Sequence, residues 1–393
     1  MASLTAGEAR LGTNAKLRAN SENGAMARRV ERFALQSVVR DILPDSRTAK
    51  CLRIRAHDSD VGVWKSKTHK TAHYSGLQTC GSVWRCPVCA AKIAERRRLE
   101  IQTAMALHRA QGGDVQLLTL TVPHTRHDSL EALVGAQAKA LEAFWRDMTV
   151  KTVLKEMGYV GRIRAYEVTH GRKGTNNGWH PHFHFLMFGM KKVDQAYLQD
   201  WKVRLHARWD NYCKKAGLGS PSLAHGIDLR DGAQATKYVA KWGLEDEMTK
   251  AHTKKGKAGG ETPFDLLRAV LADSGDKQAM ALFAEFAEFF QGKSQLHWSK
   301  GLKKRFAIGE KDDEQVAQEA VEDADLLGLV TPDQWRDVLK VKARGIVLEL
   351  AAAAGWPAVQ KFFHFIDGCR DGVYEYDAAM VAEARSLILE GMT

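Results

Sequence analysis

The sequence predicts a chain of mixed strands and helices, as in an α+β fold, and three features favour this class. Runs rich in β-branched, aromatic and other apolar residues span 115–122, 162–169 and 182–188. Apolar residues recur at helical spacing over 129–154. Only the turn-prone segment 171–178 separates the second and third strands, so we expect these two to form an antiparallel hairpin.

Composition points to a polyanionic partner. The chain has 393 residues, enough for two to three domains, and a net charge of +11, with a sequence pI near 9.3. This balance favours nucleic acid as partner. We find no apolar run of membrane-spanning length, and residues 1–23 lack the apolar core of a secretory signal. We therefore expect a cytoplasmic protein with no membrane partner. In that reducing compartment, clustered cysteines bind metals more often than they form disulfides.

Cysteines crowd together near the start of the chain. Three of them form a Cys-x5-Cys-x2-Cys pattern, with a proline after the second: Cys80, Cys86 and Cys89. Four thiolates satisfy a structural Zn²⁺, and Cys51 is the natural fourth ligand, with His69 and His73 as alternatives. The competing interpretation is a redox pair or three unrelated thiols.

Arginines accompany the cysteine knuckle. Arg85 lies inside it, and Arg96, Arg97 and Arg98 follow on an expected helix, 90–111. A knuckle carrying a basic helix is suited to contact duplex DNA through its phosphates. The alternative is a basic face that is merely solvated.

The expected strand 182–188 carries two histidines. His182 and His184 lie two residues apart, so they share one face of a strand. Imidazole suits several divalent metals, and the pair does not identify which. Glu167, on the neighbouring strand of the hairpin, is an oxygen ligand candidate. The alternatives are histidines held only by hydrogen bonds and a glutamate that is simply solvated.

A helix is expected over 231–243. Gln234, Tyr238 and Lys241 fall on one of its faces, and Lys237 is next to the tyrosine. A tyrosine titrates near about 10. Neighbouring ammonium groups and a divalent cation would favour its phenolate form, and hence nucleophilic attack. A tyrosine on a helix can equally serve packing alone.

Taken in order, these segments resemble a known family. Residues 117–121 (LLTLT), 182–186 (HFHFL) and 238–241 (YVAK) are similar to the three motifs of HUH endonucleases. The similarity is greatest to rolling-circle replication initiators of small bacterial plasmids that use one catalytic tyrosine. The cysteine knuckle and the segment 295–303 (QLHWSKGLK) are also typical of that branch, and the resemblance covers 51–306.

The resemblance implies an architecture. HUH nucleases have a central antiparallel sheet of about five strands flanked by helices, here with a zinc knuckle and a helical C-terminal module. With the composition of the flanking segments, the resemblance predicts five parts in order: a flexible N-terminal extension, 1–40; knuckle and basic helix, 41–111; HUH endonuclease domain, 112–309; acidic linker, 310–330; and helical module, 331–393.

The resemblance also implies an activity: site-specific, metal-dependent nicking and joining of DNA at a plasmid origin. Attack by tyrosine would leave a 5′-phosphotyrosine and free a 3′-hydroxyl that primes replication. Mg²⁺ or Mn²⁺ would be the catalytic ion and Zn²⁺ the structural one. The resemblance implies that His182, His184 and Glu167 bind the catalytic ion. It implies that Tyr238 is the nucleophile, and that Lys241 and Lys237 position the phosphate.

One position departs from the family. Where part of the family has a glutamate that helps a water molecule end the reaction, this chain has Gln234, and glutamine is no carboxylate base. Either another residue activates that water, or a tyrosine from a second subunit acts, which would require a dimer. The expected partners are origin DNA, as a single-stranded nick site with adjacent duplex, and a bacterial host's helicase and DNA polymerase.

Two other functions are compatible with these residues. A related HUH transposase or mobilisation relaxase would use the same chemistry on other DNA sites. A non-catalytic, zinc-dependent DNA-binding regulator would use the histidines structurally, and Tyr238 would then be dispensable.

Overall fold

The structure is a computed structural model that describes most of the chain. The described residues are 22–56, 60–68, 71–173, 176–241, 260–319, 323–370 and 378–391. The chain divides into two compact units, each built from separate segments. Met1–Ser37, Ala49–Thr79 and Ala320–Thr393 form the first unit, and Val38–Thr48 and Cys80–Glu319 form the second.

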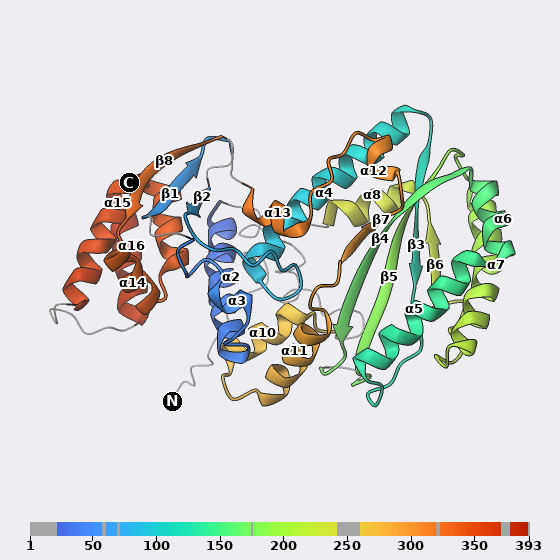
Figure 1. Cartoon of the computed structure of the whole chain (residues 1–393), viewed down its shortest axis with the longest axis horizontal. Helices are drawn as coiled ribbons and strands as arrows, with labels where there is room; N and C mark the ends of the chain where they lie inside the picture. Colours follow the sequence, from blue (N-terminus) through green and yellow to red (C-terminus); the bar gives the residue numbers. More distant parts are fainter. Residues whose placement is uncertain are drawn as a thin grey trace, which may run out of the picture. The chain divides into compact units, whose positions relative to one another are not determined.

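The second unit is built on a five-stranded antiparallel sheet in the order β6-β3-β5-β4-β7 (Figure 1). Its strands are β3 (Asp114–Leu120), β4 (Tyr159–His170), β5 (Trp179–Gly189), β6 (Ile227–Arg230) and β7 (Leu296–Trp298). The predicted antiparallel hairpin is β4 paired with β5. An α+β fold with five antiparallel strands is therefore confirmed.

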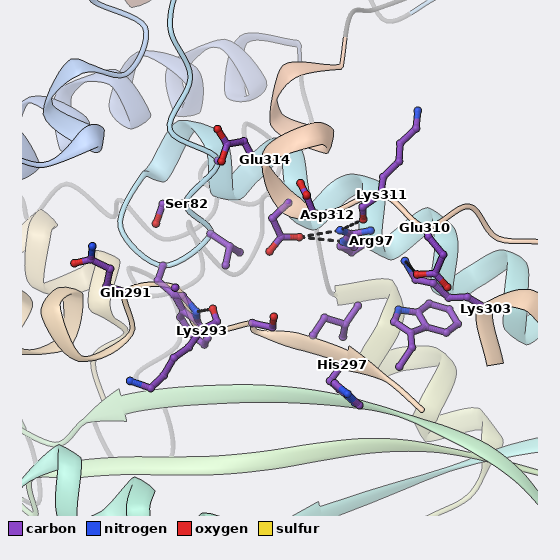
Figure 2. A pocket seen from close by; sticks show the side chains of 18 of the residues that line it. Ser82, Arg97, Gln291, Lys293, His297, Lys303, Glu310, Lys311, Asp312 and Glu314 are labelled. Atoms are coloured by element: carbon purple, nitrogen blue, oxygen red, sulfur yellow. Dashed lines mark hydrogen bonds and ion pairs between the residues drawn. The ribbon is translucent and has the colours of Figure 1, made fainter. Parts of the chain in front are cut away.

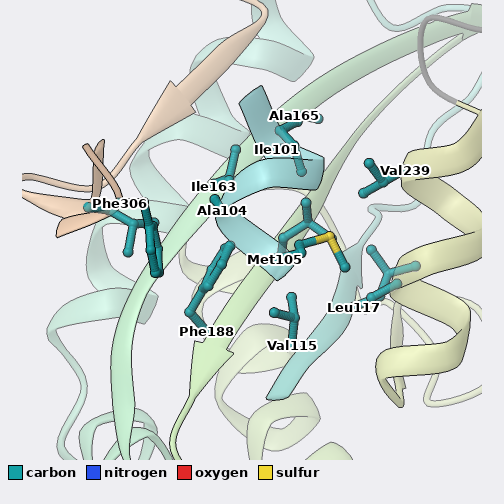
Figure 3. Packing of buried hydrophobic residues seen from close by; sticks show 13 residues of the cluster. Ile101, Ala104, Met105, Val115, Leu117, Ile163, Ala165, Phe188, Val239 and Phe306 are labelled. Carbon is teal, nitrogen blue, oxygen red and sulfur yellow. The ribbon is translucent and has the colours of Figure 1, made fainter. Parts of the chain in front are cut away.

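One face of this sheet packs against α4 (Pro87–Ala110) and α8 (Gly232–Lys241). Their apolar side chains meet those of β3, β4 and β5 in one buried cluster (Figure 3). Phe188 of β5 is fully buried there, with its ring 5.2 Å from the His108 ring and 5.6 Å from that of Phe306. This cluster holds α8, and with it Tyr238, against the sheet.

The opposite face is covered by α5 (Leu130–Arg146), which packs on α7 (Gln195–Lys215). The Trp145 ring lies 5.1 Å from Phe185 of β5, and the Phe144 ring lies 5.7 Å from Trp209 of α7. Alternation along β5 therefore divides its side chains between two different helical layers.

The helix expected over 129–154 is two helices, α5 and α6 (Met148–Met157). They separate at Asp147, whose carboxylate caps α6 by accepting from the Thr149 and Val150 amides. The same carboxylate also accepts from Tyr212 of α7. A local cap reinforced from α7 thus interrupts a continuous apolar periodicity.

Two further helices follow the gap in the described residues after α8, namely α10 (Pro263–Ala272) and α11 (Lys277–Phe289). Phe283 and Phe286 of α11 are buried, and so is Phe290 just after it. These aromatic rings therefore serve packing. Two short helices complete the unit, α12 (Leu302–Arg305) and α13 (Asp313–Gln318).

The first unit contains a three-stranded antiparallel sheet in the order β2-β1-β8. Its strands are β1 (Val61–Ser66), β2 (Ala72–Ser75) and β8 (Ala324–Val330), and its C-terminal helices are α14 (Pro332–Lys340), α15 (Arg344–Arg370) and α16 (Ala378–Glu390). Arg344 is buried and donates to Gln36 Oε1 and to the Leu52 carbonyl, while its own carbonyl accepts from Tyr74. One side chain thus joins three segments of this unit.

Two stretches differ from the sequence expectation. The expected extension 1–40 contains most of α2 (Glu22–Ile42), while residues 1–21 lie outside the described part. The short helix α3 (Arg47–Lys50) follows it. The expected linker 310–330 contains α13 and β8. β8 is easily missed because its pairing partner, β1, lies far away in the chain, and no local pattern reveals such a pairing.

Within the described ranges, every helix is too short or too polar to cross a bilayer.

The buried cluster predicts the first stability test. Phe188→Ala should lower the free energy of unfolding by about 3–5 kcal/mol, because it leaves a cavity in a packed core. Urea denaturation measures this change. Leu107→Ala on α4, where the side chain is largely exposed, should shift stability by no more than about 0.5 kcal/mol. Equal effects of the two variants would contradict the packing described here.

Candidate metal and tyrosine site

The register of the sheet brings three polar side chains to one face. Glu167 of β4 lies directly opposite His182 of β5, and Thr119 of β3 lies directly opposite His184. Because β5 lies between β3 and β4, both neighbours reach its two histidines. The prediction that Glu167 lies beside the histidine pair agrees with this geometry.

The three predicted ligands converge. Glu167 Oε2 lies 3.4 Å from His182 Nε2 and 3.5 Å from His184 Nε2. A divalent ion about 2.0–2.2 Å from each ligand atom would set neighbouring ligand atoms roughly 3.0–3.5 Å apart. Two imidazole nitrogens and a carboxylate oxygen at this spacing fit such an ion.

Hydrogen bonds orient both imidazoles. His182 Nδ1 lies 3.2 Å from the His180 carbonyl, which only accepts, so Nδ1 carries a proton and Nε2 is the nitrogen left to serve as a metal ligand. His184 Nδ1 lies 2.8 Å from Thr119 Oγ1. Partners on the far nitrogen of a ligand histidine fix its tautomer and ring orientation.

The charge on Glu167 suits a ligand. Burial raises the pKa of this carboxyl, but the adjacent imidazoles of His184 and His182 outweigh burial and hold the pKa well below its usual range. The carboxylate therefore stays ionised at neutral pH.

Tyr238 joins this group from α8. Its hydroxyl donates to Glu167 Oε1 at 2.6 Å, and its ring lies 4.7 Å from the His184 ring. One carboxylate thus touches the tyrosine with one oxygen and faces the imidazoles with the other. At the start of α8, the Asp231 carboxylate accepts from the Gln234 amide, as expected of a cap.

The other predicted residues of α8 lie around this tyrosine. Gln234 is partly buried, one helical turn before it, and Lys237 is exposed. Lys241 ends the helix, and its side chain lies outside the described part of the chain.

A second group of polar residues adjoins the histidines and was not found from the sequence. His124 Nε2 accepts from Asn177 Nδ2 at 3.0 Å, and His124 Nδ1 lies 3.3 Å from His180 Nδ1. Burial, with the neighbouring histidines, lowers the pKa of His180 to about 3, so this imidazole is neutral. No spacing pattern in the sequence links His124 to His180.

The cysteine knuckle lies in the second unit. Cys80 Sγ and Cys89 Sγ are 3.7 Å apart, close to the roughly 3.8 Å of two thiolates on a tetrahedral Zn²⁺ with bonds of about 2.3 Å. This separation is far from a disulfide bond of about 2.0 Å. Cys86 caps α4 and accepts from the Cys89 amide, and Thr48 donates to the Cys80 sulfur.

Cys51 belongs to the first unit, where its side chain is 0% exposed. Cys51 and the three cysteines of the knuckle are all buried. This donor set is consistent with structural zinc. Of the two alternative ligands, His73 is partly exposed on β2, and His69 lies outside the described residues.

Arg97 differs from the other predicted DNA contacts. It is only 7% exposed, and its guanidinium binds Glu100 at 3.0 Å and Asp313 at 2.9 Å. This arginine therefore fastens α13 to α4 and has little surface to offer a ligand. Sequence spacing did not reveal this role, because Asp313 lies far along the chain.

Three predicted DNA contacts retain access to solvent. Arg96 is exposed and lies 3.6 Å from Glu100. Arg98 is partly exposed and pairs with Glu95, and Arg85 is partly exposed beside Gln291. Their contact with DNA remains a prediction.

A groove of about 710 Å³ adjoins the knuckle (Figure 2). Its walls come from the knuckle loop 80–85, the segment 291–301 around β7, and the segment 310–314. The Arg97–Asp313 pair is drawn there as dashed lines, and Arg47 pairs with Glu314 on the same wall. Both basic and acidic residues therefore line the groove.

Together these features define an α+β protein with a candidate divalent-metal site beside a tyrosine. Residues 74–336 match the Rep_1 family, described as a replication protein, and the chain belongs to this family. It is 27% identical over 352 residues to "Protein rep" of Streptomyces lividans, a match covering 71% of this chain and 75% of the relative.

A second relative covers less of both proteins. The chain is 34% identical over 155 residues to "Neomycin resistance protein" of Streptomyces cyanogenus, which covers 33% of this chain and 35% of that protein. No solved structure matches the chain.

The hydrogen bond to His184 predicts a change in metal affinity. Thr119→Val should weaken Mn²⁺ binding by roughly tenfold to a hundredfold, because the imidazole loses the partner that orients it. Calorimetric titration measures this affinity without any nucleic acid. Thr121→Val is the matched control, since Thr121 lies on the same chain segment but donates to the His225 carbonyl. Wild-type affinity in Thr119→Val would show that this bond does not support a metal ligand.

Proposed function

We propose that this replication protein initiates rolling-circle replication of a bacterial plasmid by nicking and rejoining one DNA strand at the origin. The observation that carries the proposal is the position of Tyr238: its hydroxyl contacts the same carboxylate that faces both histidines. A nucleophile and a metal site thus share one group. Membership of the family and the net positive charge support a DNA substrate.

In the proposed reaction, Tyr238 Oη attacks the scissile phosphorus, and the bond from phosphorus to the 3′ oxygen breaks. The products are a 5′-phosphotyrosine and a 3′-hydroxyl, which takes up a proton and primes synthesis by a host polymerase. Glu167 orients the attacking hydroxyl through their hydrogen bond. Lys237, and Lys241 at the end of α8, would position the phosphate.

Mg²⁺ or Mn²⁺ would be held by His182, His184 and Glu167. When bound, the ion polarises the phosphate and offsets the charge that develops in the transition state. The two imidazoles contribute neutral ligands whose orientation is set by their hydrogen bonds.

Ending the reaction requires a different group from the glutamate used in part of the family. Gln234 lies one turn before Tyr238 and can orient a water molecule without deprotonating it. We propose that either another residue activates that water or a second subunit contributes its tyrosine.

The knuckle would anchor the protein on origin DNA. We propose that Zn²⁺ binds Cys80, Cys86, Cys89 and, as fourth ligand, Cys51, because a structural zinc site takes four ligands and these thiols are all buried. The solvent-accessible arginines at and beyond the knuckle would contact duplex phosphates: Arg85, Arg96 and Arg98. Strand separation would need a helicase of the bacterial host, which places the reaction in the cytoplasm.

The decisive prediction concerns a covalent adduct. Incubation with single-stranded origin DNA and Mn²⁺ should give a protein–DNA band on a denaturing gel, because the phosphotyrosine bond survives denaturation. Tyr238→Phe should abolish the band. His182→Ala should reduce it by at least roughly a hundredfold, since the site loses a metal ligand.

Duplex binding serves as the control for both variants, and it should remain near the wild-type level. A full-strength adduct in Tyr238→Phe would contradict the assignment of the nucleophile. The absence of any adduct in the wild type, with either origin strand and several metals, would leave a DNA-binding protein without this chemistry.

The zinc assignment has its own test. The purified protein should contain about one equivalent of Zn²⁺, and Cys86→Ser should lose most of it and unfold at a lower temperature. Cys213→Ser is the matched control, because Cys213 is buried in α7 away from the cysteine set. A zinc content below half an equivalent that Cys86→Ser leaves unchanged would reject the knuckle.

A further inference from the structure

The face of the sheet turned away from the metal ligands carries a second set of polar groups. Along β4, Ile163 and Ala165 point into the cluster under α4 and α8, so Arg162 and Arg164 point to the other face. Arg164 is directly opposite His297 of the edge strand β7. These three residues, Arg162, Arg164 and His297, form what we term the β4–β7 cationic patch.

Contacts with aromatic rings hold the two arginines in place. The Arg162 guanidinium lies 4.0 Å from the centre of the Trp145 ring, and it donates to the Tyr159 hydroxyl. The Arg164 guanidinium lies 5.9 Å from the Phe183 ring. Both side chains are partly exposed, so they remain within reach of a ligand.

The patch lacks acidic partners. Among the described residues, no carboxylate forms an ion pair with Arg162 or Arg164, and the Arg164 Nε is buried without a hydrogen-bond acceptor. Other well-packed arginines of this unit differ: Arg172 binds Glu261 and Asp276. A buried donor left without an acceptor is costly, which makes this position unusual.

The neighbouring charges also act on one another. Burial, and then the charge of Arg162, lowers the pKa of Arg164. Burial, with both arginines, lowers the pKa of His297, so this imidazole is neutral at neutral pH and would meet a phosphate as a hydrogen-bond donor. Two guanidinium groups, two residues apart on a strand and so roughly 6.8 Å apart at their Cα atoms, repel each other. A bound anion would relieve this repulsion.

We propose that the β4–β7 cationic patch binds phosphate groups of duplex DNA adjacent to the nick site, on the sheet face opposite to Tyr238. This inference rests on the proposed function for the identity of the DNA. Guanidinium groups bind phosphate oxygens in bidentate fashion. Their spacing along β4 lets each arginine reach a different phosphate.

The aromatic rings beside the patch are already packed against other side chains, and this favours duplex over single-stranded DNA as the ligand. Sites for single strands stack bases on exposed aromatic faces. Here Trp145 lies under a guanidinium and packs on Phe185, and Phe183 packs on Tyr166. The patch therefore offers charge without stacking surfaces, and it leaves the face that carries the tyrosine to the strand being cut.

The test compares arginines with and without acidic partners. Binding of fluorescent origin duplex is measured by anisotropy over a range of salt concentrations. Arg164→Gln should weaken binding roughly threefold to tenfold and reduce the slope of log affinity against log salt by about 0.9. Arg146→Gln is the matched control, since this exposed arginine of α5 pairs with Glu142, and it should bind like the wild type.

Four further measurements separate binding from folding and from the chemistry. Arg164→Gln should unfold at an unchanged or higher temperature, because a like-charge contact is removed. Arg164→Lys should keep most of the salt dependence. Arg164→Gln should form the adduct with a short single-stranded oligonucleotide as well as the wild type does. If the wild type itself forms no adduct, the proposed function fails, and this result does not bear on duplex binding by the patch. His297→Ala, at an exposed position, should weaken duplex binding by about twofold to threefold, because it removes a hydrogen-bond donor to phosphate.

Wild-type duplex affinity in both Arg164→Gln and His297→Ala would overturn the proposal. An Arg164→Gln defect no larger than that of Arg146→Gln would overturn it too, as would a defect seen only with single-stranded DNA. A loss of affinity accompanied by a lower unfolding temperature, with wild-type binding by His297→Ala, would show that the arginine is structural.

Discussion

Everything at the candidate site depends on the pairing register of three strands. β5 carries the histidines, and the pairing of β4 and β3 with it places Glu167 opposite His182 and Thr119 opposite His184. Side chains alternate along a strand, so a slip of one residue would turn Glu167 to the other face and leave the histidines without their oxygen partner. The buried ring of Phe188, on the same strand and face, opposes such a slip because it would have to leave the core.

The same core determines where the tyrosine lies. Ala235 and Val239 of α8 are buried in the cluster that contains Phe188, so the helix is held with Tyr238 turned toward Glu167. A packing interaction between helix and sheet therefore determines the position of the Tyr238 hydroxyl. This arrangement is what a preorganised site requires, because catalysis loses efficiency when reacting groups must be gathered at each turnover.

The two faces of the sheet have opposite electrostatic character. The face under α8 places a carboxylate among imidazoles, where a cation is favourable. The face beside α5 places Arg162 and Arg164 together, and no carboxylate of the described residues pairs with them, so an anion is favourable there. Arg97 differs, because Glu100 and Asp313 neutralise it within the fold. The positive charge of Arg162 and Arg164 is thus available to a ligand, whereas that of Arg97 is neutralised within the fold.

The sequence by itself determined the periodic features. Strand alternation placed His182 and His184 on one face, helical spacing placed Tyr238 on α8, and the cysteine spacing indicated the knuckle. Only the tertiary structure decided which distant residues meet them: the tyrosine with Glu167, Thr119 with His184, and Asp313 with Arg97, which removed a predicted DNA contact from the surface. The reason is physical. Local periodicity depends on backbone geometry within a few residues, whereas strand register and helix docking depend on the packing of side chains far apart in the chain.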